Sequence, residues 1–164
     1  MDKDIRCRID FEYAVIGSGF SGISVVKGLN DLGVNSICVI SPEPSGGGLW
    51  RNQGKSSRLH HPSNIYLVPG IVPSSRYNRS DNLYCATAAE VQAYAEECYE
   101  TIQATKITGF VTEVTRLDDS GLKVCYWRHK TGGESDDREG EETYVTCQYA
   151  VQATGHGHWA GDPR

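Results

Sequence analysis

The stretch Tyr13-Ala14-Val15-Ile16-Gly17-Ser18-Gly19-Phe20-Ser21-Gly22 decides the fold of this chain. Apolar residues lead directly into a Gly-x-Gly-x-x-Gly turn, and a helical pattern follows at once. Gly17 permits the tight turn, Gly19 lets a dinucleotide approach the backbone, and Gly22 lets the helix pack close to the strand. The helix N-terminus then faces a pyrophosphate with free N–H groups and its positive dipole end. The pattern predicts a dinucleotide-binding site.

The residues around this turn predict a strand, a helix and a second strand. Residues 9–16 are typical of a buried strand, and residues 21–31 place Ile23, Val26 and Leu29 at helical spacing before a stop at Gly33. Residues 36–40 form a short apolar run rich in β-branched side chains, which favours a second buried strand parallel to the first. A βαβ unit of this size strengthens the glycine pattern as evidence for a dinucleotide site.

The rest of the chain predicts a different β architecture. Residues 51–86 are polar and irregular, with 64–68 as either a short strand or a segment that packs across the domain. Thr87 and Glu90 form a capping box that opens a helix over 87–104, with a buried face of Val91, Tyr94, Ala95, Cys98 and Ile102. Runs at 107–117, 122–128 and 143–152 predict a three-stranded antiparallel meander, with a turn at 118–121 and a solvated loop at 130–142.

Length and composition predict one domain spanning residues 1–164. Residues 10–50 hold the βαβ unit and glycine turns, 51–86 the connection, 87–104 the helix, and 105–155 the meander and return strand. A net charge of -5 argues against a nucleic-acid partner. The sequence shows no secretory signal and no apolar run of membrane-spanning length, so we expect a cytoplasmic protein with no membrane partner.

The cysteines and histidines predict no metal site. The six cysteines form no Cys-x-x-Cys pair, and we expect reduced, buried thiols rather than disulfides. His60 and His61 lack a third ligand at suitable spacing, and we assign them no catalytic role. His156 and His158 are expected to be solvent-facing loop residues.

Three further features resemble the FAD-binding half of the flavin-containing and Baeyer–Villiger monooxygenases. Gly46-Gly47-Gly48-Leu49-Trp50 follows the second strand, a helix and meander replace another βαβ unit, and an apolar strand ends in Ala153-Thr154-Gly155. The resemblance extends from about Tyr13 to Gly155. It implies an α/β, Rossmann-like FAD-binding domain, with a parallel sheet and an inserted three-stranded antiparallel meander. It also implies a flavoprotein oxidoreductase in which NADPH reduces FAD and oxygen is transferred to a small-molecule substrate.

The resemblance also implies which residues bind FAD. In the first turn the pyrophosphate would be surrounded by Gly17, Ser18, Gly19, Phe20, Ser21 and Gly22. The flavin side of the cofactor would lie along Gly47, Gly48, Leu49 and Trp50, with Trp50 as an apolar wall or, alternatively, an ordinary core aromatic. Val114 matches a position near the adenine, and Thr154 and Gly155 match the segment that returns close to FAD.

One departure from the family concerns the ribose. The second strand of such a site ends in a carboxylate that accepts hydrogen bonds from the ribose hydroxyls, and here that position is Ser41. Glu43, two residues later, either substitutes for this carboxylate or is an exposed loop residue. We therefore expect weak FAD affinity.

The second departure is the lack of another glycine pattern. Complete relatives continue into an NADPH-binding domain, which this sequence does not contain, so NADPH would bind only if a second domain or a partner chain is supplied. The leading hypothesis is the FAD-binding portion of an FAD/NADPH-dependent monooxygenase-like oxidoreductase, apparently truncated. The alternatives are a non-catalytic or degenerate dinucleotide-binding module and, third, an NAD-dependent dehydrogenase. The sequence names no catalytic residue.

Overall fold

The computed structural model describes residues 9–54, 56–73, 77, 83–117, 121–129 and 140–155. The first elements are β1 (Phe11–Ile16), α1 (Phe20–Asp31) and β2 (Ile37–Ser41). β1 and β2 pair in parallel, and all five residues of β2 are buried. The βαβ unit predicted from the sequence is confirmed, with boundaries that differ by one or two residues.

Six strands form one mixed sheet in the order β3-β2-β1-β6-β5-β4. The remaining strands are β3 (Thr105–Thr108), β4 (Phe110–Leu117), β5 (Gly121–His129) and β6 (Gly140–Gln152). β3, β2, β1 and β6 are parallel, whereas β5 runs antiparallel to β6 and β4 antiparallel to β5. The predicted fold class, a Rossmann-like parallel sheet with an antiparallel three-stranded meander, is confirmed.

β6 belongs to both parts of the sheet. Its first half, up to Cys147, pairs with β5, and its second half, from Cys147 to Gln152, pairs with β1. The third meander strand and the return strand to the glycine turn are therefore one continuous element. This element connects the meander rigidly to the site-bearing end of β1.

The single run predicted over 107–117 is wrong, because Gly109 divides it into β3 and β4. β3 pairs with β2 at one edge of the sheet, and β4 pairs with β5 at the other. One residue joins the two edge strands, so the sheet must curl until its edges meet. A Cβ atom at Gly109 would lie 2.5 Å from Cδ2 of Tyr126, which explains why a glycine stands where the chain crosses between edges.

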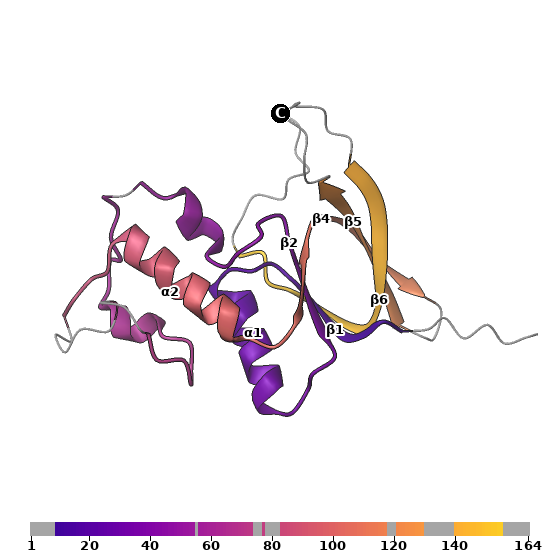
Figure 1. The fold of residues 1–164 in the computed structure, drawn as a ribbon, viewed down its shortest axis with the longest axis horizontal. Helices are drawn as coiled ribbons and strands as arrows, with labels where there is room; N and C mark the ends of the chain where they lie inside the picture. Colours follow the sequence, from indigo (N-terminus) through magenta and orange to yellow (C-terminus); the bar gives the residue numbers. More distant parts are fainter. Residues whose placement is uncertain are drawn as a thin grey trace, which may run out of the picture.

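Two cores lie on opposite faces of the parallel strands. Helices α1 and α2 (Ala88–Thr101) cover one face, and the meander folds over the other (Figure 1). The helix-side core includes Val15, Val39 and Ile23, while the meander-side core includes Cys38 and Val124. Alternate residues of β1 and β2 thus enter different cores, as expected for strands buried on both faces.

The capping box of α2 is formed as predicted. The N–H of Glu90 donates to Oγ1 of Thr87 at 3.3 Å, and the N–H of Thr87 donates to Oε2 of Glu90 at 2.9 Å. The predicted buried face is also confirmed, with relative exposures of 4% or less at Val91, Tyr94, Ala95, Cys98 and Ile102. The helix itself ends at Thr101, three residues before the predicted end.

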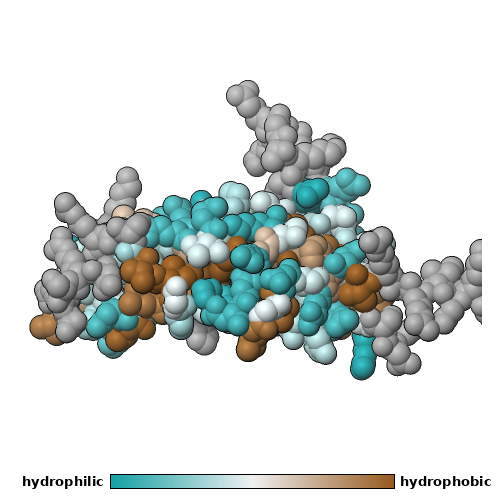
Figure 2. All heavy atoms as spheres, turned by 60° about the horizontal axis from the view of Figure 1, so that its bottom comes forward, coloured by the Kyte–Doolittle hydropathy of each residue, from teal (hydrophilic) through white to brown (hydrophobic). Residues whose placement is uncertain are grey.

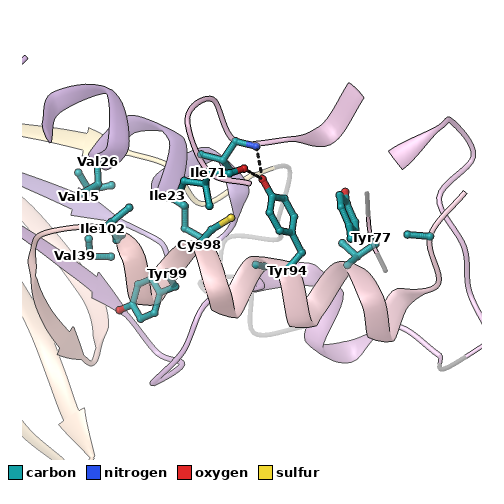
Figure 3. Close-up of a cluster of buried hydrophobic side chains, with 14 of the residues drawn as sticks. Val15, Ile23, Val26, Val39, Ile71, Tyr77, Tyr94, Cys98, Tyr99 and Ile102 are labelled. Carbon is teal, nitrogen blue, oxygen red and sulfur yellow. Dashed lines mark hydrogen bonds between the residues drawn. The ribbon is translucent and has the colours of Figure 1, made fainter. Parts of the chain in front are cut away.

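The connection after β2 contains two 3₁₀ helices, η1 (Gly48–Asn52) and η2 (Ser63–Tyr66). The strand alternative for 64–68 is therefore wrong. The connection packs on α2 through the Tyr94 hydroxyl, which accepts from the N–H of Val68 at 2.8 Å and donates to the carbonyl of Ile71 at 3.2 Å. Figure 3 shows this hydroxyl pointing into the backbone of the connection.

The connection also exposes large apolar side chains. Leu49, Ile65, Val72 and Leu83 are between 63% and 82% exposed. On the face drawn in Figure 2, apolar areas stand separately between polar ones. Within the described part of the chain, no helix is long and apolar enough to cross a bilayer.

Some predicted features lie outside the described residues. They are the turn at 118–120, the loop from 130 to 139, and His156 and His158.

Candidate functional site

The candidate site lies where β1, β2 and β6 end together. The N–H of Gly17 donates to the carbonyl of Ile40 at 2.8 Å, and the N–H of Ala153 donates to the carbonyl of Ile16 at 2.9 Å. These bonds hold the glycine turn between the carboxyl ends of β2 and β6. In open α/β sheets, ligands bind at this edge of the parallel strands.

Two glycines of the first turn are required by close backbone packing. Gly17 has φ +111°, and a Cβ atom there would lie 2.6 Å from the carbonyl oxygen of Ala153. A Cβ atom at Gly22 would lie well inside 3.0 Å of the carbonyl oxygen of Gly17. The helix therefore packs directly against the turn that precedes it, as the sequence predicts for the third glycine.

Gly19 stands at the N-terminus of α1 and has open space beside it. It is the N-cap residue, with extended φ and ψ and no side-chain hydrogen bond to the cap. The first turn of α1 carries no acidic residue and its N-cap makes no side-chain hydrogen bond, so no carboxylate there competes with or repels an anion at the backbone N–H groups. Such a helix end is suited to an anion such as a pyrophosphate.

The second glycine segment touches the first. The N–H of Gly47 donates to the carbonyl of Ser18 at 3.2 Å. Gly48 has φ +51°, and a Cβ atom there would lie 3.0 Å from Cα of Gly19. The structure thus brings together two glycine segments that are separated by about 30 residues in the sequence, and their facing residues, Gly19 and Gly48, are both partly exposed.

Ser41, the residue at the predicted ribose position, is committed to a contact within the protein. It is 3% exposed, and its Oγ lies 2.8 Å from Oγ of Ser18, which is 2% exposed. The N–H of Glu43 also donates to Oγ of Ser41, at 3.3 Å. The Ser41 hydroxyl therefore connects the end of β2 to the glycine turn.

Glu43 is ion-paired rather than free. Its Oε2 lies 3.3 Å from Nε of Arg51, and its side chain is 42% exposed. Sequence reasoning did not assign Arg51 any role, although it directly follows Trp50. Its spacing of eight residues from Glu43 carries no signal of a contact, because the intervening glycines reverse the chain.

Leu49 and Trp50 differ in their surroundings. Leu49 is 74% exposed, whereas Trp50 is half-buried and packs against the helix-side core. Both line an open groove of about 520 Å³. Its other lining residues come from the segment after η1 and from the end of η2: Gln53, Ser57, Arg58, Leu59, His60, His61 and Tyr66. Sequence reasoning left His60 and His61 without a role, yet the fold places them in the groove beside Trp50.

The other turn residues and the return segment lie as follows. Phe20 packs on the helix-side core, with its ring centroid 5.9 Å from that of Tyr94, and Ser21 is exposed. Thr154 is exposed, and its Oγ1 accepts from Nε2 of Gln152 at 3.3 Å. Gly155 has φ +70°.

Val114 lies in the meander, apart from the glycine segments in sequence and sheet order. It is on β4, opposite Val124, and is 42% exposed. Its predicted role beside the adenine stays a prediction.

The groups with shifted pKa values lie in the cores. Burial raises the pKa of the Cys38 thiol to about 12, and the neighbouring Cys147 adds to the shift. Burial likewise raises the pKa of the Tyr94 phenol above its ordinary value. No cluster of three potential metal ligands occurs among the described residues. The described site therefore has the geometry of a binding site, built mainly from backbone.

The chain is similar in structure to several solved proteins. A flavin-containing monooxygenase from Stenotrophomonas maltophilia shares 23% identity with a TM-score of 0.68, over 90% of this chain and 39% of that one. The bacillithiol disulfide reductase of Bacillus cereus shares 18% identity with a TM-score of 0.69, and the match covers 88% of this chain and 40% of the reductase. OTEMO in complex with FAD and NADP shares 24% identity with a TM-score of 0.64, and the match covers 88% of this chain and 25% of OTEMO.

These likenesses establish the fold, a Rossmann-like α/β fold shared with these solved proteins. The chain spans between a quarter and two fifths of the length of these solved proteins. No family model and no curated protein sequence matches the chain.

Proposed function

We propose that this chain binds FAD and forms the FAD-binding portion of an NADPH-dependent, monooxygenase-like oxidoreductase. The observation that carries the proposal is the contact between the two glycine segments at the uncapped N-terminus of α1. A Cβ atom at Gly48 would lie 3.0 Å from Cα of Gly19, so a side chain at position 48 would crowd the start of α1. A pyrophosphate needs such side-chain-free backbone, with N–H groups directed at its oxygens.

The meander supports FAD rather than NAD as the dinucleotide. A plain NAD-binding domain would continue after β3 with helices and further parallel strands, whereas this chain crosses at Gly109 into antiparallel strands. The similar solved structures include a flavin-containing monooxygenase and three forms of one protein in complex with FAD and NADP. An NAD-dependent dehydrogenase is therefore the least supported reading.

Each part of the site has a role in this proposal. The N–H groups at the start of α1 bind the pyrophosphate, and Gly47 and Gly48 let the cofactor lie against the loop. Trp50 forms an apolar wall of the groove where the flavin side of the cofactor would lie. When bound, FAD supplies the redox chemistry, and the protein supplies binding and orientation. We assign no side chain as a catalytic acid or base.

The hydride donor and the substrate require surfaces beyond this domain. We propose that a second domain or a partner chain supplies the NADPH site, since the chain spans at most two fifths of the similar solved proteins. The exposed apolar residues Leu49, Ile65, Val72 and Leu83 support a docking surface on the connection. The substrate would be a small molecule that enters beside Trp50.

Titration of the purified chain with FAD tests the proposal. We expect quenching of flavin fluorescence and a structured flavin absorption band on binding, with no comparable binding of NAD⁺. Binding of NAD⁺ in preference to FAD, or of neither dinucleotide, would overturn the FAD assignment.

A second candidate function is a dinucleotide-binding module without turnover. The contacts of Ser41 and Glu43 favour it, because neither side chain offers a free carboxylate to the ribose. Weak affinity follows, and we expect FAD to be lost on extensive dialysis. NADPH-consumption assays with and without candidate partner chains separate the two functions. Turnover in any pairing supports the enzyme, and its absence in all of them supports the module.

A further inference from the structure

Arg51 holds several segments of the site at once. Its Nε lies 3.3 Å from Oε2 of Glu43, its Nη1 lies 3.8 Å from Oε1 of Glu96 on α2, and Nη1 also donates to Oγ of Ser45. The arginine side chain is only 24% exposed. A guanidinium group presents five donors in a planar fork, which lets one side chain bind three acceptors from different directions.

The aliphatic part of Arg51 lies against the glycine loop. Gly47 has φ +121°, and a Cβ atom there would lie 3.1 Å from Cγ of Arg51. On its other side, the N–H of Gly47 donates to the carbonyl of Ser18 in the first turn. The Arg51 side chain therefore packs against the glycine loop at Gly47, next to the residue, Gly48, that contacts Gly19.

The contacts continue from Arg51 to the first glycine turn. The backbone of Glu43 donates to the Ser41 hydroxyl, and Ser41 contacts Ser18. Ser18 also lies 3.2 Å from the carbonyl of Ser45, which places both ends of the loop within one hydrogen-bonded group. Arg51 is therefore connected, through Glu43 and Ser45, to the residues that hold the loop against the first glycine turn.

We propose that Arg51 is a positioning residue that fixes the loop of residues 43–48 against the first glycine turn in the conformation that receives the dinucleotide. This inference rests on the proposed FAD binding. Arg51 would act without contacting the cofactor. It acts by removing alternative conformations of a loop that contains three consecutive glycines and would otherwise be ordered only when the ligand binds.

Three variants test the role of Arg51. Arg51→Met keeps the aliphatic stem over Gly47 and removes all the polar contacts, and Arg51→Lys keeps the charge without the fork. Arg116→Met, at an exposed position on β4, is the matched control. We expect Arg51→Met to raise the Kd for FAD about fivefold, corresponding to about 1 kcal/mol. Arg51→Lys should fall between it and the wild type, and Arg116→Met should leave the Kd unchanged.

Two further measurements separate positioning from general stabilisation. Hydrogen exchange of the cofactor-free protein should show faster exchange at residues 45–48 in Arg51→Met, with unchanged exchange in β1 and β2. The affinity difference between wild type and Arg51→Met should shrink as salt is raised, because the ion pairs of Arg51 are partly exposed and screened.

The outcomes are distinguishable from those of the proposed function. A wild-type chain that does not bind FAD refutes the proposed function, while the exchange measurement still tests the loop. Wild-type FAD affinity in Arg51→Met, or unchanged exchange at residues 45–48, overturns the positioning role. If Arg51→Met does not fold, Arg51→Lys provides the test. A Kd for FAD and an exchange rate at residues 45–48 that both equal those of the wild type would then overturn the positioning role.

Discussion

Replacing Gly22 by alanine tests whether the close packing of α1 on the glycine turn determines both stability and cofactor binding. The new Cβ atom would meet the carbonyl oxygen of Gly17, a backbone atom that cannot rotate away. Relief requires α1 to move by on the order of 1 Å, since carbon and oxygen atoms do not pack much inside 3 Å. Gly28 provides the matched control, because it lies in the same helix and a Cβ atom there meets nothing within 4 Å.

The two substitutions should have opposite effects on stability. Alanine is preferred over glycine in a helix by about 0.8–1 kcal/mol, so Gly28→Ala should raise the free energy of unfolding by nearly that amount. At Gly22 the same gain is outweighed by the cost of overpacking. This cost is typically about 1–3 kcal/mol, and we expect the upper end because the contact is with rigid backbone. The net loss is about 2 kcal/mol. For a chain of this length, Tm should fall by about 4–8 °C in Gly22→Ala and rise by about 2–4 °C in Gly28→Ala.

Cofactor affinity should follow the position of the helix rather than its stability. A shift of α1 lengthens the hydrogen bonds from its first N–H groups to the pyrophosphate, and charge-assisted bonds of this kind are the strong ones. We expect at least about a tenfold loss of FAD affinity in Gly22→Ala, equivalent to about 1.4 kcal/mol, and none in Gly28→Ala. Urea unfolding and fluorescence titration measure the two effects. A Gly22→Ala protein as stable as Gly28→Ala, with unchanged FAD affinity, would refute the reasoning.

Two further predictions concern the cores. Tyr94→Phe removes the hydroxyl that joins Val68 and Ile71, leaving a buried N–H and a buried carbonyl without that partner, so urea unfolding should show a loss of about 1–3 kcal/mol. Tyr149→Phe, at a 54% exposed side chain, is the control and should change little. Because burial raises the pKa of Cys38 to about 12, the unfolded thiol ionises first above pH 9, and stability should fall by up to about 1.4 kcal/mol per pH unit. Cys38→Ala should flatten the decline measured between pH 9 and 10, and an unchanged slope would contradict the assignment.

The glycine-bearing parts of the site were predictable because their constraint is local. Gly17 and Gly22 lie within one turn, and the reason for each glycine is a backbone atom only a few residues away or at the end of a neighbouring strand. Any sequence that forms this strand–turn–helix needs small residues at this spacing. The helix-forming patterns were predictable for the same reason, since a capping box and a period of 3.6 residues are properties of one segment.

The division of the predicted strand at Gly109 was not predictable from such local patterns. The alternation of polar and apolar residues continues across the glycine, from Ile107, the buried residue of β3, to the half-buried Val111 of β4, and both belong to the meander-side core. What separates the strands is the identity of their partners: β2 for one, β5 for the other. Pairing partners are set by the whole sheet, so an isolated glycine in a strand pattern indicates only that a bulge or crossing is possible there.

This chain has Ser41 where the second strand of a dinucleotide site usually ends in a carboxylate, and the difference cannot be interpreted from position 41 alone. Position 41 is enclosed, and its closest polar partner, Ser18, lies 23 residues earlier in the glycine turn. A carboxylate here would be a nearly buried charge, whereas serine satisfies Ser18 and the N–H of Glu43 without one. The identity of residue 41 is therefore coupled to that of residue 18, through a contact that only the folded chain creates. A smaller residue at position 18 would remove the 2.8 Å partner of residue 41, so we expect any ribose recognition at position 41 to depend on which residue stands at position 18.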